Sequence, residues 1–172
     1  MTIQEYQKLA ERTCPSLGEE IDTLHMRMGV TTEIAEAVDA FKKHIAYGKE
    51  LDLVNIQEEI SDACWYIVND MRFKQEDFTE DSLEGIEFED EFKTPEHLSA
   101  TLMSSLMRYL SGDFDNPFML KFLEAFSSCL GLDFYKGLEN NINKLKIRFP
   151  DKFDTEKALN RDLEAEREEL EK

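Results

Sequence analysis

Two pairs of acidic residues are the part of this sequence best suited to chemistry. Glu33 and Glu36 form the first pair, and Glu59 and Asp62 form the second. Each pair is spaced three residues apart, which places both carboxylates on one side of a helix. Carboxylates that lie close together resist ionisation unless a cation sits among them. Because all the donors are oxygens, the pairs predict a site for Mg²⁺, with Mn²⁺ as the alternative, rather than for zinc.

A short break at residues 47–49 separates the two acidic segments, so the helices that carry them can fold back on each other. We expect the first of these helices over residues 19–46 and the second from residue 52, with an apolar stripe that reaches Met71. Counted at about 100° per residue, both acidic pairs lie on the same flank relative to their apolar stripes. The two pairs are therefore expected to face each other across an antiparallel helix pair.

A later helix, expected between residues 133 and 150, carries polar residues on the matching flank. Asn141, Lys144 and Arg148 form a line displaced about 90° from its apolar stripe. An amide and two cations beside a metal site suit a polyphosphate, because ammonium and guanidinium groups neutralise phosphate oxygens. Lys43, after the first acidic pair, is a further candidate for phosphate binding, with ordinary surface charge as the alternative.

Aromatic residues accompany the second acidic pair. Trp65 and Tyr66 lie on or beside the polar flank of that helix, where their rings could stack on a nucleobase. The alternative is that both rings pack against another helix or a second subunit. Glu58 and Asp39 are alternative metal ligands, because each lies within a turn of the proposed ones; Glu58 ranks lower because it points away from the face of Glu59.

The whole chain, residues 1–172, is expected to form a single all-α domain. Gly and Pro are scarce, at 7 and 4 residues, which favours helices over loops and turns. Thr2, Thr94 and Asp133 are expected to cap helices. The other expected parts of this helical bundle are helices over residues 2–12, 94–110 and 117–131, an exposed acidic loop over residues 74–93, and a charged C-terminal helix within residues 151–172.

Composition also limits the partners and the compartment. The net charge of -18 argues against a basic surface for nucleic acid. The longest apolar run, residues 63–68, is far too short to cross a bilayer, so no membrane partner is expected. The 3 cysteines have no C-x-x-C spacing, and the N-terminus lacks the pattern of a signal peptide. These features predict a cytoplasmic protein.

Four segments, taken in order, resemble the all-α NTP pyrophosphatases, namely the MazG-like nucleotide pyrophosphohydrolases and the related dimeric dUTPases and phosphoribosyl-ATP pyrophosphohydrolase. The segments are residues 29–36, 41–43, 58–62 and 141–150. The family motif is E-x-x-E, a spacer and E-x-x-D, and the two acidic pairs match it. The tail of the chain is similar to that of single-domain, often phage-borne, members. Residues 74–116 have no counterpart in the resemblance and look like an insertion.

The resemblance implies Mg²⁺-dependent hydrolysis of an NTP or dNTP to the nucleoside monophosphate and pyrophosphate. The four acids would hold the metal, and Glu33 or Glu36 would orient or deprotonate the attacking water. Lys144 and Arg148 would stabilise phosphoryl charge as it develops. Because the family works as dimers or dimers of dimers, the resemblance also implies a homo-oligomer.

Two other functions stay open. The first is a narrower pyrophosphohydrolase that acts on phosphoribosyl-ATP or on an alarmone nucleotide. The second is a catalytically silent, acidic interaction module, in which the loop at residues 74–93 and the charged tail bind a basic partner. An assay for metal-dependent nucleotide hydrolysis distinguishes the two enzyme hypotheses from the interaction module.

Overall fold

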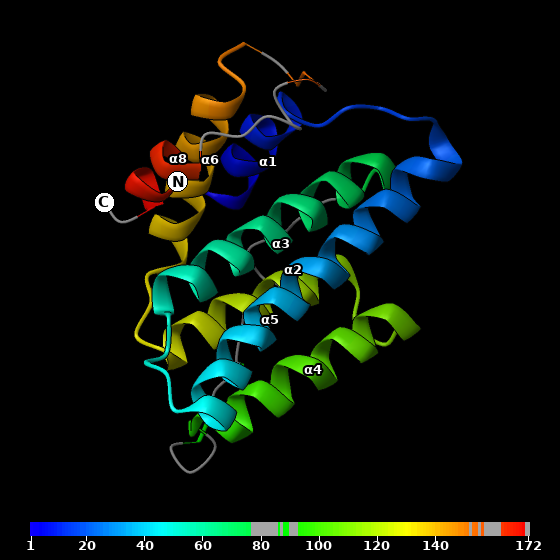
Figure 1. Cartoon of the computed structure of the whole chain (residues 1–172). Helices are drawn as coiled ribbons and strands as arrows, with labels where there is room; N and C mark the ends of the chain where they lie inside the picture. The colour runs from blue at the N-terminus through cyan, green and yellow to red at the C-terminus, as the bar shows by residue number, and fades with distance from the viewer. Residues whose placement is uncertain are drawn as a thin grey trace.

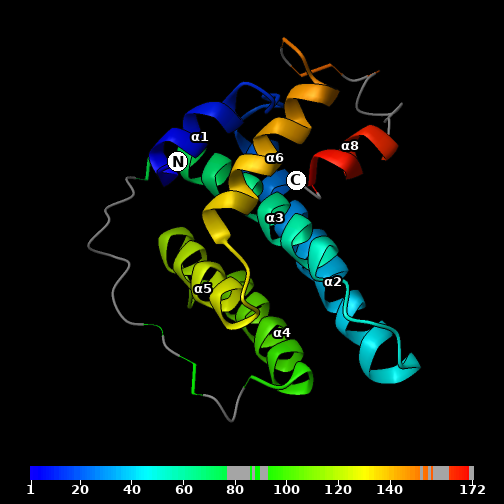
Figure 2. The ribbon, with the colours of Figure 1, turned by 90° about the vertical axis from the view of Figure 1, so that its left-hand side faces the viewer.

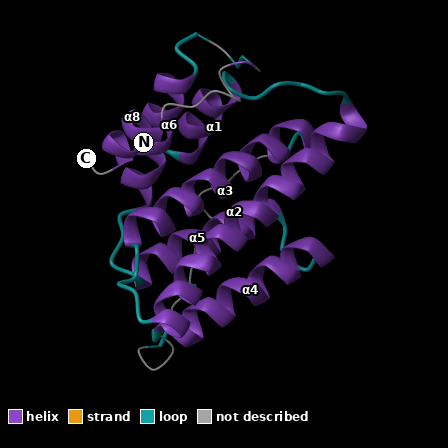
Figure 3. Ribbon diagram, viewed as in Figure 1, coloured by secondary structure: helices purple, strands orange, loops and turns teal. Residues whose placement is uncertain are grey.

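Every regular element in the described part of the chain is an α-helix (Figure 3). The computed structural model describes residues 1–76, 86, 88–89, 93–151, 153–154, 156 and 163–170. The all-α class predicted from the sequence is therefore confirmed for these residues. The helices are α1 (Ile3–Glu11), α2 (Glu19–Tyr47), α3 (Leu53–Lys74), α4 (Pro95–Ser111), α5 (Asn116–Cys129), α6 (Phe134–Arg148) and α8 (Leu163–Leu170).

The long helices α2 and α3 lie side by side and run in opposite directions through the middle of the molecule (Figure 1). α2 ends where Gly48 adopts a left-handed conformation with φ of 64°, which glycine enters without the strain that a Cβ would cause. Asp52 then caps α3 by accepting a hydrogen bond from the backbone N–H of Asn55. The predicted fold-back of the two acidic helices is confirmed.

Helix α3 is enclosed by several neighbouring helices. The residues of its predicted apolar stripe, Ile56, Ile60, Ala63, Ile67 and Met71, are all 1% exposed or less. Burial is this complete because α1, α2, α5 and α6 all pack on α3, and Figure 2 shows several of them around it. Polar side chains on the buried faces of α3 therefore have little access to water and need partners within the protein.

Gly29 lies in the middle of α2, where glycine ordinarily weakens a helix. α2 nevertheless runs through this position without interruption. A Cβ at Gly29 would lie 2.2 Å from carbon atoms of the Tyr66 ring, so the missing side chain makes room for that ring. Gly29 precedes Glu33 by one helical turn, and Tyr66 follows Asp62 by one turn. The close approach of α2 and α3 therefore lies beside the acidic residues.

The segment predicted as an insertion contributes to the bundle. Helix α4 packs on both α2 and α5. Within the predicted acidic loop, residues 77–85, 87 and 90–92 lie outside the described residues. Ile86 and Phe88 are partly buried against the core, and the Phe88 ring centre is 6.0 Å from that of Phe122. The loop is therefore not exposed at these two positions, because their apolar side chains have partners in the core.

The predicted charged C-terminal helix is described as α8, which packs on α6. Residues 152, 155, 157–162 and 171–172 of the segment in which this helix was expected lie outside the described residues. No helix in the described ranges has an apolar stretch of the length needed to cross a bilayer.

Candidate functional site

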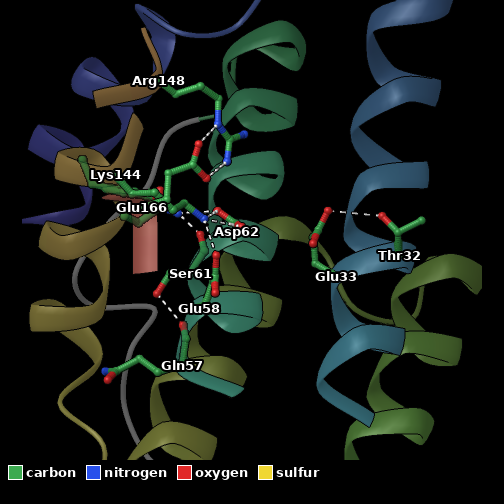
Figure 4. Close-up of polar contacts among 11 residues, drawn as sticks. Thr32, Glu33, Gln57, Glu58, Ser61, Asp62, Lys144, Arg148 and Glu166 are labelled. Atoms are coloured by element: carbon green, nitrogen blue, oxygen red, sulfur yellow. Dashed lines mark hydrogen bonds and ion pairs between the residues drawn. The ribbon is translucent and has the colours of Figure 1, made fainter. Parts of the chain in front are cut away.

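Three carboxylates from the two central helices converge at one point. Glu33 of α2 and Glu59 and Asp62 of α3 each place an oxygen within 4.8 Å of the others. Figure 4 shows Glu33 directed from α2 toward the face of α3 that carries Asp62. Residues three apart on α3 share a face, and the antiparallel turn brings Glu33 opposite them. The structure thus brings together three of the four acids predicted as metal ligands.

Glu36 and Glu58 lie at the edge of this cluster. Glu36, the fourth predicted ligand, is exposed and is not one of the three converging acids, although it lines the same cavity. Glu58 ranked lower in the sequence analysis, yet it also lines that cavity. Glu58 and Asp62 are four residues apart, so they share a face of α3 just as Glu59 and Asp62 do.

Burial and crowding disfavour the charged forms of these acids. Burial raises the pKa of Glu59 to about 9, and the charges of Asp62 and Glu33 add to the effect. Burial also raises the pKa of Glu33 to about 7, with the charge of Asp62 adding to it and a hydrogen bond with Glu59 opposing it. A divalent cation would reverse both shifts by favouring the carboxylates. The donor set therefore fits Mg²⁺ or Mn²⁺.

Asp62 is held in place from α6. The Lys144 ammonium donates to both Asp62 oxygens, at 2.8 and 2.6 Å, and to Glu58 at 3.1 Å (Figure 4). The Asn141 amide also donates to Asp62, while its oxygen accepts from the Tyr6 hydroxyl at 2.8 Å. Lys144 and Asn141 are both 0% exposed. These contacts form a buried network behind Asp62.

This network changes the interpretation of two predicted substrate residues. Lys144 and Asn141 are not among the described residues that line the cavity, and their contacts are with the carboxylates instead. Burial alone would lower the pKa of Lys144, but Asp62 and Glu58 outweigh it and raise the pKa, so the ammonium stays charged. Groups of this kind orient a metal-ligating carboxylate and balance its charge.

Of the other two cations predicted to bind phosphate, Arg148 lies at the cavity and Lys43 does not. Arg148 lines the cavity, and its guanidinium pairs with Glu166 of α8. Lys43 points elsewhere, because its ammonium is 2.7 Å from Asp39 on the surface of α2 and it is not among the described lining residues. Asp39, the other alternative ligand, is thereby paired with a lysine at the surface.

The acids open onto a cavity of about 640 Å³ that is lined by acidic and by apolar side chains. Trp65, 9% exposed, donates from its ring nitrogen to the Thr13 hydroxyl at 3.0 Å and meets the Tyr66 ring edge-on, with the ring centres 4.9 Å apart. Trp65 therefore packs within the protein and lines the cavity as well. The apolar and aromatic lining residues include Leu17, Trp65, Tyr66, Leu145, Phe149 and Phe153.

Sequence reasoning assigned no role in the site to three residues of this region. The Tyr6 hydroxyl reaches Asn141 from α1, Glu166 reaches Arg148 from α8, and His25 lines the cavity with a buried Nδ1 that has no hydrogen-bond partner in the described part of the chain. Tyr6 and Glu166 lie on different helices from Asn141 and Arg148, the residues that they contact. No local spacing could have identified them.

Comparisons of the chain with protein-family models, with curated proteins and with solved structures give no match. The family assignment therefore stays a prediction from the sequence motifs.

Proposed function

We propose that this protein is a divalent-metal-dependent pyrophosphohydrolase that converts a nucleoside triphosphate to the monophosphate and pyrophosphate. We also propose that its fold is of the MazG-like all-α type. The observation that carries the proposal is the convergence of Glu33, Glu59 and Asp62 at the wall of a cavity of about 640 Å³. Cavities of this size commonly accept a ligand as large as a nucleotide.

The chemistry of the cavity supports this class of substrate. Its acidic residues suit Mg²⁺ or Mn²⁺, which when bound would polarise phosphate oxygens and lower the pKa of a coordinated water. Glu33, Glu59 and Asp62 would hold the metal, and Glu33 or Glu36, which both line the cavity, would accept a proton from water. The aromatic residues would contact the base, since Tyr66 is only partly buried and lines the cavity.

Cations behind and beside the acids complete the proposed arrangement. Lys144 would orient Asp62 through hydrogen bonds to both of its oxygens, while Arg148 is the residue that would contact a phosphoryl oxygen. This division of roles revises the sequence-based hypothesis, in which both cations bind phosphate. It follows from burial: Lys144 is 0% exposed and Arg148 lines the cavity.

Incubation with a panel of NTPs and dNTPs, phosphoribosyl-ATP and alarmone nucleotides in Mg²⁺ or Mn²⁺ tests the proposal. The expected products are the monophosphate and pyrophosphate, and the member of the panel that reacts fastest identifies the substrate. If every nucleotide stays intact while circular dichroism shows a folded helical protein, the enzyme is excluded and the acidic interaction module becomes the better explanation.

Substitution of the ligands tests the assignment of the site. Loss of an outer partner of a metal ligand commonly costs about 10- to 100-fold, so Glu59→Gln or Asp62→Asn should lower kcat/KM by at least about 100-fold. Glu50→Gln is the matched control, because Glu50 is an exposed acid outside the cavity. Full activity in Glu59→Gln and Asp62→Asn would remove these acids from the reaction.

A further inference from the structure

Acidic side chains outnumber cationic ones in the described lining of the cavity. Five acids line it, namely Glu33, Glu36, Glu58, Glu59 and Asp62. Among the described lining residues, Arg148 is the one with a permanent positive charge. The position of this guanidinium therefore matters for any anion that enters.

Arg148 is fixed by an acid from a different helix. Its Nε donates to Oε1 of Glu166 at 2.8 Å, and its Nη2 donates to Oε2 at 2.5 Å (Figure 4). Two parallel hydrogen bonds of this type set the plane of the guanidinium. The remaining nitrogen, Nη1, has no hydrogen-bond partner among the described residues. Glu166 thus accepts hydrogen bonds from Nε and Nη2 of Arg148 and leaves Nη1 for a ligand.

Helix α8 is anchored well enough to hold Glu166 in this position. Glu166 is 2% exposed, so the ion pair is shielded from water. The Asn140 amide of α6 donates to the Leu170 carbonyl at 3.3 Å. Arg167 lies 3.5 Å from Asp52, the cap of α3. α8 therefore contacts α6 and the N-cap of α3.

We propose that Glu166 is a positioning residue: it holds the Arg148 guanidinium at the cavity wall so that Nη1 can bind a phosphoryl oxygen. The identity of the anion rests on the proposed function. An arginine already ordered before binding loses less conformational freedom when the anion arrives. The opposite role is also physically reasonable, because a carboxylate beside the arginine reduces its attraction for an anion. The two roles give opposite results on substitution.

The experiment measures the binding of inorganic pyrophosphate, in Mg²⁺, to the full chain by titration calorimetry. Glu166→Ala should weaken binding by about tenfold, since Arg148 loses two charge-assisted hydrogen bonds that order it. Glu166→Gln removes the charge but keeps an acceptor and the side-chain volume, so it should bind more tightly than Glu166→Ala. Glu168→Ala, an exposed position on the same helix, is the control and should bind like the wild type.

A double-mutant cycle shows whether Glu166 acts through Arg148. In the Arg148→Ala background, Glu166→Ala should have no further effect on pyrophosphate binding, because the group that it positions is gone. A purely structural role would instead weaken binding by the same factor in both backgrounds. Thermal unfolding of each variant checks that the helices remain folded, and Glu166→Gln keeps the comparison usable if Glu166→Ala does not fold.

Several results would overturn the inference. They are tighter or unchanged binding in Glu166→Ala, additive effects in the cycle, or no pyrophosphate binding by the wild type in Mg²⁺. These outcomes are separate from failure of the proposed function. If no nucleotide is hydrolysed but pyrophosphate binding follows the cycle, the enzyme proposal fails and the role of Glu166 stands. If nucleotides are hydrolysed but the cycle is additive, only the role of Glu166 fails.

Discussion

At the scale of single residues, the carboxyl groups of Glu33 and Glu59 are in surroundings that favour their protonated forms. Burial raises their pKa values to about 7 and about 9, from an ordinary value of 4.5. The charge of Asp62 contributes to both shifts, although Lys144 partly balances it from α6. The same crowding that would hold a divalent cation is therefore unfavourable without one.

This arrangement makes the stability of the metal-free protein depend on pH. Glu33 and Glu59 each have a higher pKa in the folded protein than in the unfolded chain, so their protonated forms stabilise the fold. This contribution to the free energy of unfolding is complete below about pH 4.5 and is lost as the pH rises through about 7 for Glu33 and about 9 for Glu59. In EDTA, the wild type should therefore lose stability relative to Glu59→Gln across this range. Mg²⁺ should restore the stability of the wild type and should stabilise Glu59→Gln less.

Thermal unfolding followed by circular dichroism, in EDTA and in Mg²⁺, measures both effects. Comparison with Glu59→Gln is essential, because the other acids of the chain titrate in both proteins and their contributions largely cancel. Glu50→Gln, at an exposed position, should behave like the wild type. A difference between wild type and Glu59→Gln that does not change with pH would contradict the environment assigned to Glu59.

At the scale of elements, the sequence predicted the helices well because their ends are determined locally. Thr2, Thr94 and Asp133 were expected to cap helices, and each accepts a hydrogen bond from a backbone N–H in the first turn. Gly48 and Asp52 define the turn between α2 and α3 in the same local way. Such signals lie within a few residues of the feature that they specify.

The partners of the site residues could be predicted only in part. Helical spacing indicated that Lys144 and Asn141 lie near the acids, and they do. Spacing could not show whether Lys144 pairs with a carboxylate or remains available to phosphate, because that depends on how closely α6 packs on α3. Glu166 could not be assigned at all, since its pairing with Arg148 depends on where α8 docks.

Packing between α2 and α3 gives a prediction at this scale. In an exposed helix, replacing glycine by alanine stabilises the protein by up to about 1 kcal/mol. At Gly29 the new Cβ would lie 2.2 Å from the Tyr66 ring, which must move or push the helices apart. We therefore expect Gly29→Ala to destabilise the protein by about 1–3 kcal/mol, as overpacking does.

Urea unfolding of single and double variants measures this effect. In the Tyr66→Ala background the clash is absent, so Gly29→Ala should there be neutral or stabilising. This sign reversal is the specific result, because a general weakening of α2 would destabilise both backgrounds equally. If Gly29→Ala stabilises the otherwise unchanged protein, the Tyr66 ring does not occupy the space beside Gly29.

At the scale of the whole molecule, α2 and α4 carry large apolar side chains on their outer surfaces. Leu24 and Met28 of α2 are 57% and 59% exposed, and Met107 of α4 is 72% exposed. The two helices are in contact here, since the Arg27 guanidinium of α2 donates to the carbonyls of Tyr109 and Leu110 of α4 at 3.3 and 3.1 Å. These exposed apolar side chains therefore lie on two helices that contact each other, and large apolar patches on a surface commonly mark a protein interface.

We expect a second copy of the chain to cover this surface, in agreement with the oligomer that the family resemblance implies. A two-fold interface uses the same surface on both copies, so one apolar region is sufficient. The net charge of -18 on each copy opposes association, and salt should therefore strengthen the dimer by screening the repulsion. Salt would weaken an interface formed by ion pairs, whereas it has little effect on the apolar contacts themselves.

Light scattering coupled to size-exclusion chromatography measures the state of association. The wild type should have twice the monomer mass, or four times if two dimers associate, and Leu24→Lys or Met107→Lys should shift it toward the monomer. The added lysine places an ammonium at the interface, where the loss of its hydration is unfavourable. Leu9→Lys is the matched control, because Leu9 is an exposed apolar residue on α1, and it should leave the mass unchanged. A monomeric wild type, or dissociation by Leu9→Lys as well, would assign the apolar surface of α2 and α4 to something other than a second copy.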